Sequence, residues 1–216
     1  MLNAKPDLVV AYGLDSDFSG EQANVREALE GAGTQIFGIN CDAAPTDTTA
    51  SYYQRLRDLG TVLGRNAEAQ KLVDDMQARI AAVQSKVEGR EVVRGVFYYS
   101  GEGPFVVYGS GIANELIAAA GGQNVFATQA SDFPEVTAEA IAAANSDAFF
   151  WSDFGPLGAP YLPKEPLQFL FTTFPSTDAA KSQRGGAVIG AGLYPSIRMA
   201  EAVEALAKLM HPEAFK

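Results

Sequence analysis

The sequence predicts an α/β protein with two Rossmann-like lobes that contain parallel sheets and are joined by one long α-helix. Short apolar runs alternate with helical patterns along the chain, one helical pattern near residues 66–87 is much longer than the others, and the alternation restarts after Gly89. With 216 residues, of which 47% are hydrophobic, the chain is long enough to form buried cores.

The first part of the chain is typical of one βαβ unit. A short apolar run at residues 7–12 lies between a proline and a glycine, which favours a strand that is buried on both faces. A helical pattern follows, and Gly31 and Gly33 end it before a second strand at residues 34–39. Two parallel strands are too few to bury their own faces, so we expect this first lobe to be incomplete.

A helix is predicted at residues 51–63, and the helix after it is the most distinctive of the chain. Apolar residues keep to one face from Asn66 to Val87. At a rise of about 1.5 Å per residue such a helix is roughly 30 Å long, which is enough to connect two lobes. An ordinary amphipathic surface helix has the same pattern, so both interpretations stay open. The predicted parts are a partial amino-terminal lobe, a connecting helix and a carboxyl-terminal α/β lobe, at residues 1–64, 65–88 and 89–216.

The carboxyl-terminal lobe is predicted to alternate strands and helices along its whole length. Its strands are expected at residues 92–99, 105–108, 148–151 and 187–189. Its helices are expected at residues 112–120, 137–144, 166–174 and 197–210. These elements are sufficient for a complete α/β lobe.

Composition and charge argue against several classes of protein. The formal net charge is -10 and the 16 basic residues are scattered, so attraction to a nucleic-acid backbone is unfavourable. Cys41 is the only cysteine, which excludes an internal disulfide. His211 is the only histidine, which argues against a zinc or manganese site, and we expect it to be a solvent-facing cation at a helix end.

The sequence lacks the common catalytic motifs. It contains no phosphate-binding GxxxxGK[ST] loop, no GxSxG nucleophile elbow and no HExxH pair. Gly109 and Gly111 follow a predicted strand, but Asn114 takes the place of the third glycine of a dinucleotide-binding loop. An enzyme that uses only carboxylates leaves no spacing signature, so it stays an alternative, as does an interaction module without a transport role.

Several segments, taken in order, carry a resemblance to a known family. They are AKPDLVV at residues 4–10, LGTVLGRNAEA at 59–69, the stretch from Gly109 to Phe126 with its AGGQNVF end, VTAEAI at 136–141, and the tail at 198–213 that ends in LMHPE. Together they resemble the helical-backbone class of periplasmic solute-binding proteins of ABC importers, which carry ferric siderophores, haem or cobalamin. In that family the KPDLVV strand is preceded by further strands of the first lobe, so the resemblance also implies a first lobe without its leading strands.

The resemblance implies a transport role. The expected function is the extracytoplasmic substrate-binding component of an ABC importer, with a ferric siderophore as the leading ligand and haem or cobalamin as the others. The expected partner is the membrane permease, no cofactor is expected, and self-association through the incomplete first lobe is a further expectation. The expected location is the periplasm or, as a lipoprotein, the cell surface, and no signal segment is recognisable in this chain.

The resemblance also places the ligand between the two lobes, where the carboxyl ends of the strands meet. Aromatic side chains there would stack on a flat or catecholate ligand, and Arg198 would pair with ligand oxygens. Some of the tyrosines are equally suited to core or surface positions. The candidates are Tyr12, Leu14, Asp15 and Asp42 from the first lobe, and Tyr99, Tyr108, Trp151, Asp153, Tyr194 and Arg198 from the second.

Glu139 has a separate expected role. In the family a glutamate at the outer end of each lobe docks into arginine pockets of the permease, and Glu139 occupies the matching position of the second lobe. A carboxylate is also favoured near the start of a helix by the helix dipole alone, so this alternative stays open.

Overall fold

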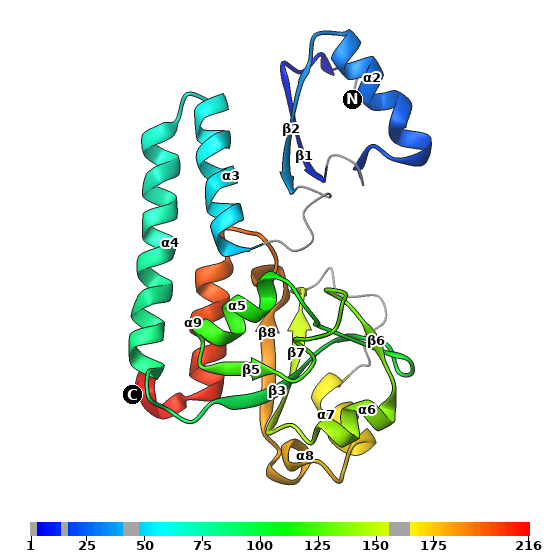
Figure 1. Cartoon of the computed structure of the whole chain (residues 1–216), viewed down its shortest axis with the longest axis vertical. Helices are drawn as coiled ribbons and strands as arrows, with labels where there is room; N and C mark the ends of the chain where they lie inside the picture. The colour runs from blue at the N-terminus through cyan, green and yellow to red at the C-terminus, as the bar shows by residue number, and fades with distance from the viewer. Residues whose placement is uncertain (1–3, 14–16, 41–47, 156–164) are drawn as a thin grey trace. The chain divides into compact units, whose positions relative to one another are not determined.

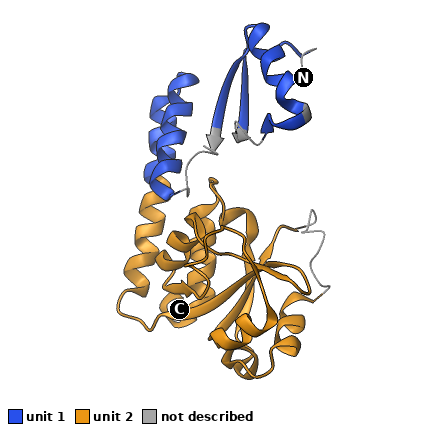
Figure 2. Ribbon diagram, turned by 45° about the vertical axis from the view of Figure 1, so that its right-hand side comes forward, with its two compact units in different colours: residues 1–74 blue, residues 75–216 orange. Residues whose placement is uncertain are grey.

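The computed structural model describes residues 4–13, 17–40, 48–155 and 165–216. The chain divides into two compact units, residues 1–74 and 75–216, which are coloured separately in Figure 2. The division falls inside the long helix, whereas the sequence assigned that helix to neither lobe. Each unit is described by itself.

Unit 1 contains the predicted βαβ unit. Strands β1 (Leu8–Gly13) and β2 (Gln35–Asn40) are parallel, with Val10 beside Phe37, and helix α2 (Ala23–Gly31) connects them after a short 3-10 turn, η2 (Gly20–Gln22). Within the described residues β1 pairs with β2 alone, and Val10 is 45% exposed. The two-stranded sheet therefore leaves apolar surface uncovered.

Two helices complete unit 1 and lead into unit 2. Helix α3 (Thr49–Val62) begins with a capping box, in which the side chain of Thr48 accepts a hydrogen bond from the Ser51 N–H and the Ser51 hydroxyl accepts one from the Thr48 N–H. Helix α4 (Asn66–Val87) has 22 residues and buries Val73, Met76, Val83 and Val87 on one side. The predicted bounds of this helix are confirmed.

Unit 2 is built on a mixed six-stranded sheet. Its strands are β3 (Val93–Ser100), β4 (Phe105–Val107), β5 (Gly122–Asn124), β6 (Glu135–Val136), β7 (Ala148–Asp153) and β8 (Gly185–Ile189). The order is β6-β4-β3-β7-β8, and β5 pairs with the first half of β3. Strands β3, β5, β7 and β8 are parallel to one another, while β4 is antiparallel to both β3 and β6. The centre of the sheet is thus parallel, as predicted.

Helices cover both faces of this sheet, as Figure 1 shows. Helices α5 (Ile112–Ala119) and α9 (Met199–Met210) contact each other and pack on β5 and β8. Helices α6 (Ala138–Ala144), α7 (Pro166–Thr173) and α8 (Asp178–Ser182) contribute to a second buried cluster around Val96, Tyr98 and Phe149. A sheet with apolar layers on both sides explains why its central strands are almost continuously hydrophobic.

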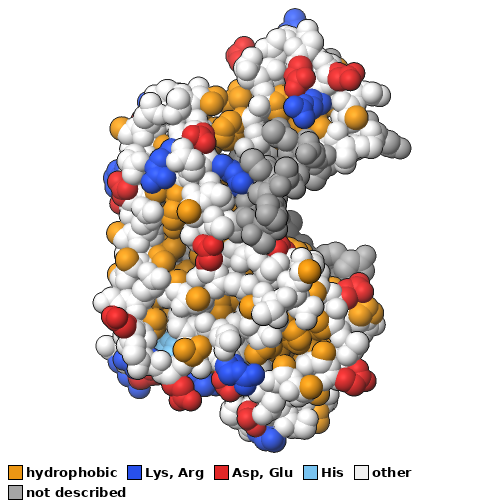
Figure 3. Space-filling model, in the orientation of Figure 1, with side chains coloured by type: hydrophobic (Ala, Val, Ile, Leu, Met, Phe, Trp, Pro, Cys, Tyr) orange, Lys and Arg blue, Asp and Glu red, His pale blue; other side chains and the backbone are white. Residues whose placement is uncertain are grey.

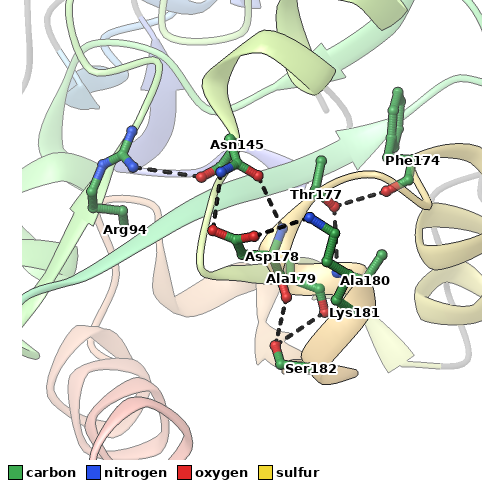
Figure 4. Close-up of polar contacts among 9 residues, drawn as sticks. All are labelled: Arg94, Asn145, Phe174, Thr177, Asp178, Ala179, Ala180, Lys181 and Ser182. Carbon is green, nitrogen blue, oxygen red and sulfur yellow. Dashed lines mark hydrogen bonds and ion pairs between the residues drawn. The ribbon is translucent and has the colours of Figure 1, made fainter.

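A polar network closes the edge of the sheet where the parallel strands begin (Figure 4). The Arg94 guanidinium donates to the carbonyl of Ala144, 3.1 Å away, at the end of α6. Asn145 follows in a left-handed conformation with φ 41° and bonds to Asp178 at the start of α8. The Thr177 hydroxyl donates to the Phe174 carbonyl and accepts from the Ala180 N–H, which caps α8. The network satisfies helix ends that would otherwise lack partners.

The α/β class predicted from the sequence is confirmed. The sequence did not predict β5, β6 or α8, nor the short 3-10 turns η4 (Gly190–Gly192) and η5 (Pro212–Phe215). Among the helices in the described ranges, none combines the length and the apolar character that crossing a bilayer requires. On the face drawn in Figure 3, basic and acidic side chains are interspersed, in agreement with the scattered basic residues of the sequence.

Candidate ligand-binding site

The carboxyl ends of the central strands of unit 2 meet at one edge of the sheet. Strand β3 ends with Tyr99 and Ser100, the parallel strand β7 ends with Ser152 and Asp153, and Asp153 lies beside Ile189 of β8. In open α/β sheets this edge is where ligands bind, because the loops there converge on exposed backbone groups. We call it the carboxyl edge.

Five aromatic rings form a continuous cluster at the carboxyl edge. Phe133 lies at its centre, with ring centroids 4.9 Å from Tyr99, 5.2 Å from Tyr108 and 5.5 Å from Tyr194, on which it stacks. Phe154 joins the cluster edge-on, 5.9 Å from Tyr99 and 6.2 Å from Tyr194. These spacings are those of favourable aromatic pairs, so the rings support one another. The aromatic cluster below means these five residues.

Tyr108 is the buried support of the aromatic cluster. It is 1% exposed, and its hydroxyl accepts a hydrogen bond of 2.8 Å from the buried Ser152 hydroxyl. Burial raises the pKa of Tyr108, so its hydroxyl stays protonated throughout the physiological range. The backbone carbonyl of Tyr108 accepts a hydrogen bond of 2.8 Å from the buried side-chain amide of Asn124. This second bond holds the backbone just after β4 in place. The other four rings are partly exposed.

A cavity of about 360 Å³ lies beside the aromatic cluster. Its lining residues are Asp153, Phe154, Gly155, Ala187, Val188, Ile189, Ala191 and Arg198. Phe154 packs directly on Gly190, where a Cβ atom would come within 2.7 Å of the ring. Arg198 precedes α9 and makes an ion pair of 2.9 Å with Glu201, and this contact raises the pKa of Arg198 further. The cavity therefore offers one aromatic face, one guanidinium and one carboxylate.

The structure brings together five of the six residues predicted in unit 2. Tyr99, Tyr108 and Tyr194 belong to the aromatic cluster, and Asp153 and Arg198 line the adjacent cavity. Trp151 lies two residues before Asp153 on β7, where it is half-buried and packs against the apolar core. Their contact with a ligand stays a prediction. The burial of Tyr108 favours a role in holding the neighbouring rings over one as a ligand surface.

The residues predicted in the first lobe are only partly described. Tyr12 lies near the end of β1, and its side chain is not described. Leu14, Asp15 and Asp42 lie outside the described residues. Their predicted roles stay predictions.

Sequence reasoning missed two members of the aromatic cluster. Phe154 directly follows Asp153, so extending the predicted strand by a few residues would have included it. Phe133 lies in the irregular stretch between β5 and β6, where no periodic pattern exists to indicate its direction. Its position depends on backbone bonds such as that from the Gly109 N–H to the Asp132 carbonyl, 2.9 Å long, which connect distant parts of the chain.

The expectation for His211 was wrong. His211 is 4% exposed, and its Nε2 lies 3.1 Å from the Gly121 carbonyl, where the absence of a side chain at Gly121 makes room for the imidazole ring. The side chain is a packed interior group and does not face solvent. Among the described residues, no three His, Cys, Asp or Glu side chains form a group that could hold a metal ion.

A larger cavity of about 520 Å³ lies at the opposite, amino edge of the sheet, and we do not assign the site to it. Arg90 and Arg184 line it; Arg90 pairs with Glu213 at 2.8 Å, and Arg184 donates to the Met210 carbonyl at 2.8 Å. None of the five aromatic rings lines this cavity. It also lies away from the edge where α/β sheets bind ligands.

The comparison with known families decides the identity of this fold. The family model described as periplasmic binding protein matches residues 1–160. The chain belongs to the periplasmic binding protein family. The family is one of binding proteins, and the fold is that of its helical-backbone class.

Individual relatives agree with this assignment. The chain is 28% identical over 149 residues to the vitamin B12-binding protein of Vibrio parahaemolyticus, a match that covers 68% of this chain and 50% of the relative. This periplasmic binding protein thus spans about half the length of that curated relative in the match. The solved haem-binding protein RhuT from Roseiflexus sp. RS-1 in apo form has a TM-score of 0.75 at 23% identity, covering 99% of this chain and 78% of RhuT.

A second solved structure, an ABC-type Fe3+-hydroxamate transport system protein from Saccharomonospora viridis, has a TM-score of 0.74 at 22% identity. The match covers 97% of this chain and 70% of that protein. At these identities the solved structures establish the fold of the periplasmic binding protein alone.

Proposed function

We propose that this periplasmic binding protein is the extracytoplasmic substrate-binding component of an ABC importer and that it captures an iron chelate, with a ferric siderophore as the leading ligand. The observation that carries the proposal is the aromatic cluster at the carboxyl edge, beside a cavity that contains Arg198. Partly exposed rings favour a ligand with flat apolar surface, and the guanidinium favours ligand oxygens. A relative named for vitamin B12 and neighbours named for haem and Fe3+-hydroxamate support this class of ligand.

The ligand proposal is tested by native mass spectrometry after incubation with a ferric hydroxamate, haem and cyanocobalamin in separate samples. We expect one of the three ligands to form a complex with one ligand per protein chain that persists on dilution. We expect the same ligand to quench the fluorescence of Trp151, because Trp151 is the only tryptophan and lies on β7 near the cavity. Absence of a complex and of quenching with every ligand would contradict the transport role and favour an interaction module. Selective binding of haem or of cyanocobalamin would replace the ferric siderophore as the proposed ligand and would leave the proposed transport role unchanged.

We further propose that Glu139 contacts the membrane permease. Glu139 is exposed in the first turn of α6, whose N-cap is the Thr137 side chain. Hydrogen bonds from its own backbone N–H and from the Thr137 hydroxyl hold the pKa of Glu139 below its usual range, so the side chain is ionised at neutral pH. An ionised, exposed carboxylate is a suitable partner for an arginine pocket.

The docking proposal is tested with Glu139→Gln in an assay of ligand-stimulated ATP hydrolysis by the reconstituted importer. We expect the stimulation to fall several-fold while ligand affinity stays the same, since the carboxylate lies outside the aromatic cluster and its cavity. Glu91→Gln is the matched control, because Glu91 is an exposed carboxylate just before β3 at the amino edge. Equal stimulation by all three proteins would exclude the role of Glu139.

A further inference from the structure

The rim of the aromatic cluster carries more negative than positive charge. Asp132 directly precedes Phe133, Asp153 directly precedes Phe154, and Glu201 lies in the first turn of α9. Among the described side chains around the cluster and its cavity, Arg198 is the one cation, and it is paired with Glu201. The described part of the rim thus has three carboxylates and one guanidinium.

These carboxylates are fixed in place by local hydrogen bonds. Asp132 accepts a bond of 3.0 Å from the Ser110 hydroxyl, and Asp153 accepts one of 2.7 Å from the Gly155 N–H. The hydrogen bond from Arg198 holds the pKa of Glu201 below its usual range. Both aspartates are exposed, and each counts as one negative charge in the formal charge of the chain.

The other described arginines of unit 2 do not line the cavity beside the aromatic cluster. Arg90, Arg94 and Arg184 lie at the amino edge of the sheet, where each has a protein partner. Arg79 of α4 makes an ion pair of 2.8 Å with Glu204. Beside the aromatic cluster, therefore, Arg198 is the one described guanidinium that stands against the three carboxylates of the rim.

Ring surface attracts flat and apolar ligands of any charge, whereas an acidic rim repels anions. Discrimination between ligands is a difference of affinities, and like charges held beside a site are an effective way to reject one class. Ferric siderophores differ in this respect: a ferric trihydroxamate of three simple hydroxamates is uncharged, while a ferric tricatecholate carries three negative charges. Haem carries two propionates, and a cobalamin carries no net negative charge.

We propose that this site selects a metal chelate or corrinoid without net negative charge and rejects anionic chelates, ferric tricatecholates above all. The inference rests on the proposed function and narrows the class of its ligand. It is carried by Asp153, which lines the cavity together with Phe154, and by Asp132, the residue directly before Phe133.

The first test compares dissociation constants by isothermal titration calorimetry for four probes: an uncharged ferric trihydroxamate, cyanocobalamin, haem and a ferric tricatecholate. We expect at least one uncharged probe to bind ten-fold or more tightly than the tricatecholate. We also expect added salt to strengthen any tricatecholate binding, since salt screens repulsion. Tight tricatecholate binding that weakens with salt would overturn this inference and keep the proposed function, whereas no binding of any probe would overturn both.

The second test uses charge-removing variants. Asp132→Asn and Asp153→Asn keep the oxygen acceptors for Ser110 and Gly155 and each remove one charge. For each variant in dilute buffer, we expect the dissociation constant of the tricatecholate, divided by that of the uncharged probe, to fall about three-fold, because one repulsive charge is removed. Glu91→Gln removes the same charge at the amino edge and leaves the ratio unchanged. An equal ratio in all four proteins would exclude the role of the acidic rim.

Discussion

Asn145 and Asp178 exchange two hydrogen bonds at the amino edge of unit 2: the Asn145 amide donates to the Asp178 carboxylate, and the Asp178 N–H donates to the Asn145 side-chain oxygen, each at 3.0 Å (Figure 4). Asn145 is also the left-handed residue that ends α6, with φ 41° and ψ 60°. One side chain thus ends α6 and fixes the start of α8, which is only five residues long. Asparagine suits this position because it tolerates left-handed backbone better than most residues do.

Asn145→Ala is therefore expected to lower the free energy of unfolding by about 2 kcal/mol, since it removes both hydrogen bonds and places alanine in left-handed backbone. Urea unfolding monitored by circular dichroism measures the change. Asn145→Gly removes the same bonds and tolerates the backbone, so it is expected to cost about 1 kcal/mol less. A glycine variant that is no more stable than the alanine variant would show that the backbone conformation contributes little.

The buried pair of Tyr108 and Ser152 predicts coupled effects on stability. Tyr108→Phe leaves the Ser152 hydroxyl without its 2.8 Å partner, and Ser152→Ala removes the same bond while the Tyr108 hydroxyl keeps its bond with Tyr194. Each change is expected to cost about 1–2 kcal/mol, and the double variant is expected to cost less than the sum, because both partners of one bond are then removed. A double-mutant cycle from denaturant unfolding measures the coupling, and strict additivity would contradict it.

Gly190 is predicted to set the position of Phe154. The backbone of Gly190 is not left-handed, so Gly190→Ala is allowed locally, but the added Cβ would lie 2.7–2.8 Å from the Phe154 ring. We expect the ring to move and the affinity for the probe that binds wild-type protein most tightly to fall about ten-fold, with a smaller effect on stability. Titration calorimetry and thermal unfolding of the same sample separate the two effects. Ala187→Gly is a control at the cavity wall that leaves Phe154 in place.

Two buried tyrosines predict the response to alkaline pH. Burial raises the pKa of both Tyr98 and Tyr108 above that of an unfolded tyrosine, which is about 10. Below that pH both states are protonated and the stabilising contribution is complete. Above it the unfolded state loses protons first, so the free energy of unfolding is expected to fall as the pH rises. Denaturant unfolding at several alkaline pH values measures the slope, and Tyr108→Phe is expected to reduce it.

The uncovered sheet of unit 1 predicts self-association. Val10 is 45% exposed on a two-stranded sheet whose outer edges have no strand partner among the described residues. Such edges pair readily with other chains. Sedimentation velocity is expected to show a concentration-dependent increase in size, and Val10→Lys is expected to reduce it. A wild-type monomer at every concentration would contradict the prediction.

Local pattern predicted the long elements and failed on the short ones. The apolar stripe of α4 extends over six turns, so its bounds could be read from the sequence. Strands β5 and β6 have three and two residues, and α8 has five, which is too few for any periodicity to emerge. Strands β5 and β6 exist because β3 and β4 offer them backbone partners, and α8 begins where Asn145 bonds to Asp178; such distant partners cannot be recognised within a single segment.

The candidate site was predictable where it follows strands and not where it depends on distant packing. Tyr99, Asp153 and Tyr194 lie at or just beyond the ends of predicted strands, so topology places them at one edge. Phe133 and the Tyr108–Ser152 bond depend on a loop and on a pair 44 residues apart. His211 shows the same limit: its pocket exists because Gly121, 90 residues earlier, has no side chain.

The division between the two units at Asp74 and Asp75 falls within the 22 continuous residues of α4. A flexible linker would let each unit fold independently and would be open to proteolysis. Here the junction is continuous α-helix, in which the backbone N–H of each residue bonds to the carbonyl of the fourth residue before it. A protease can cleave this junction only after local unraveling of the helix. Helix growth is favourable once a turn has formed. Helical structure that forms in the part of α4 belonging to one unit is therefore expected to extend into the part belonging to the other.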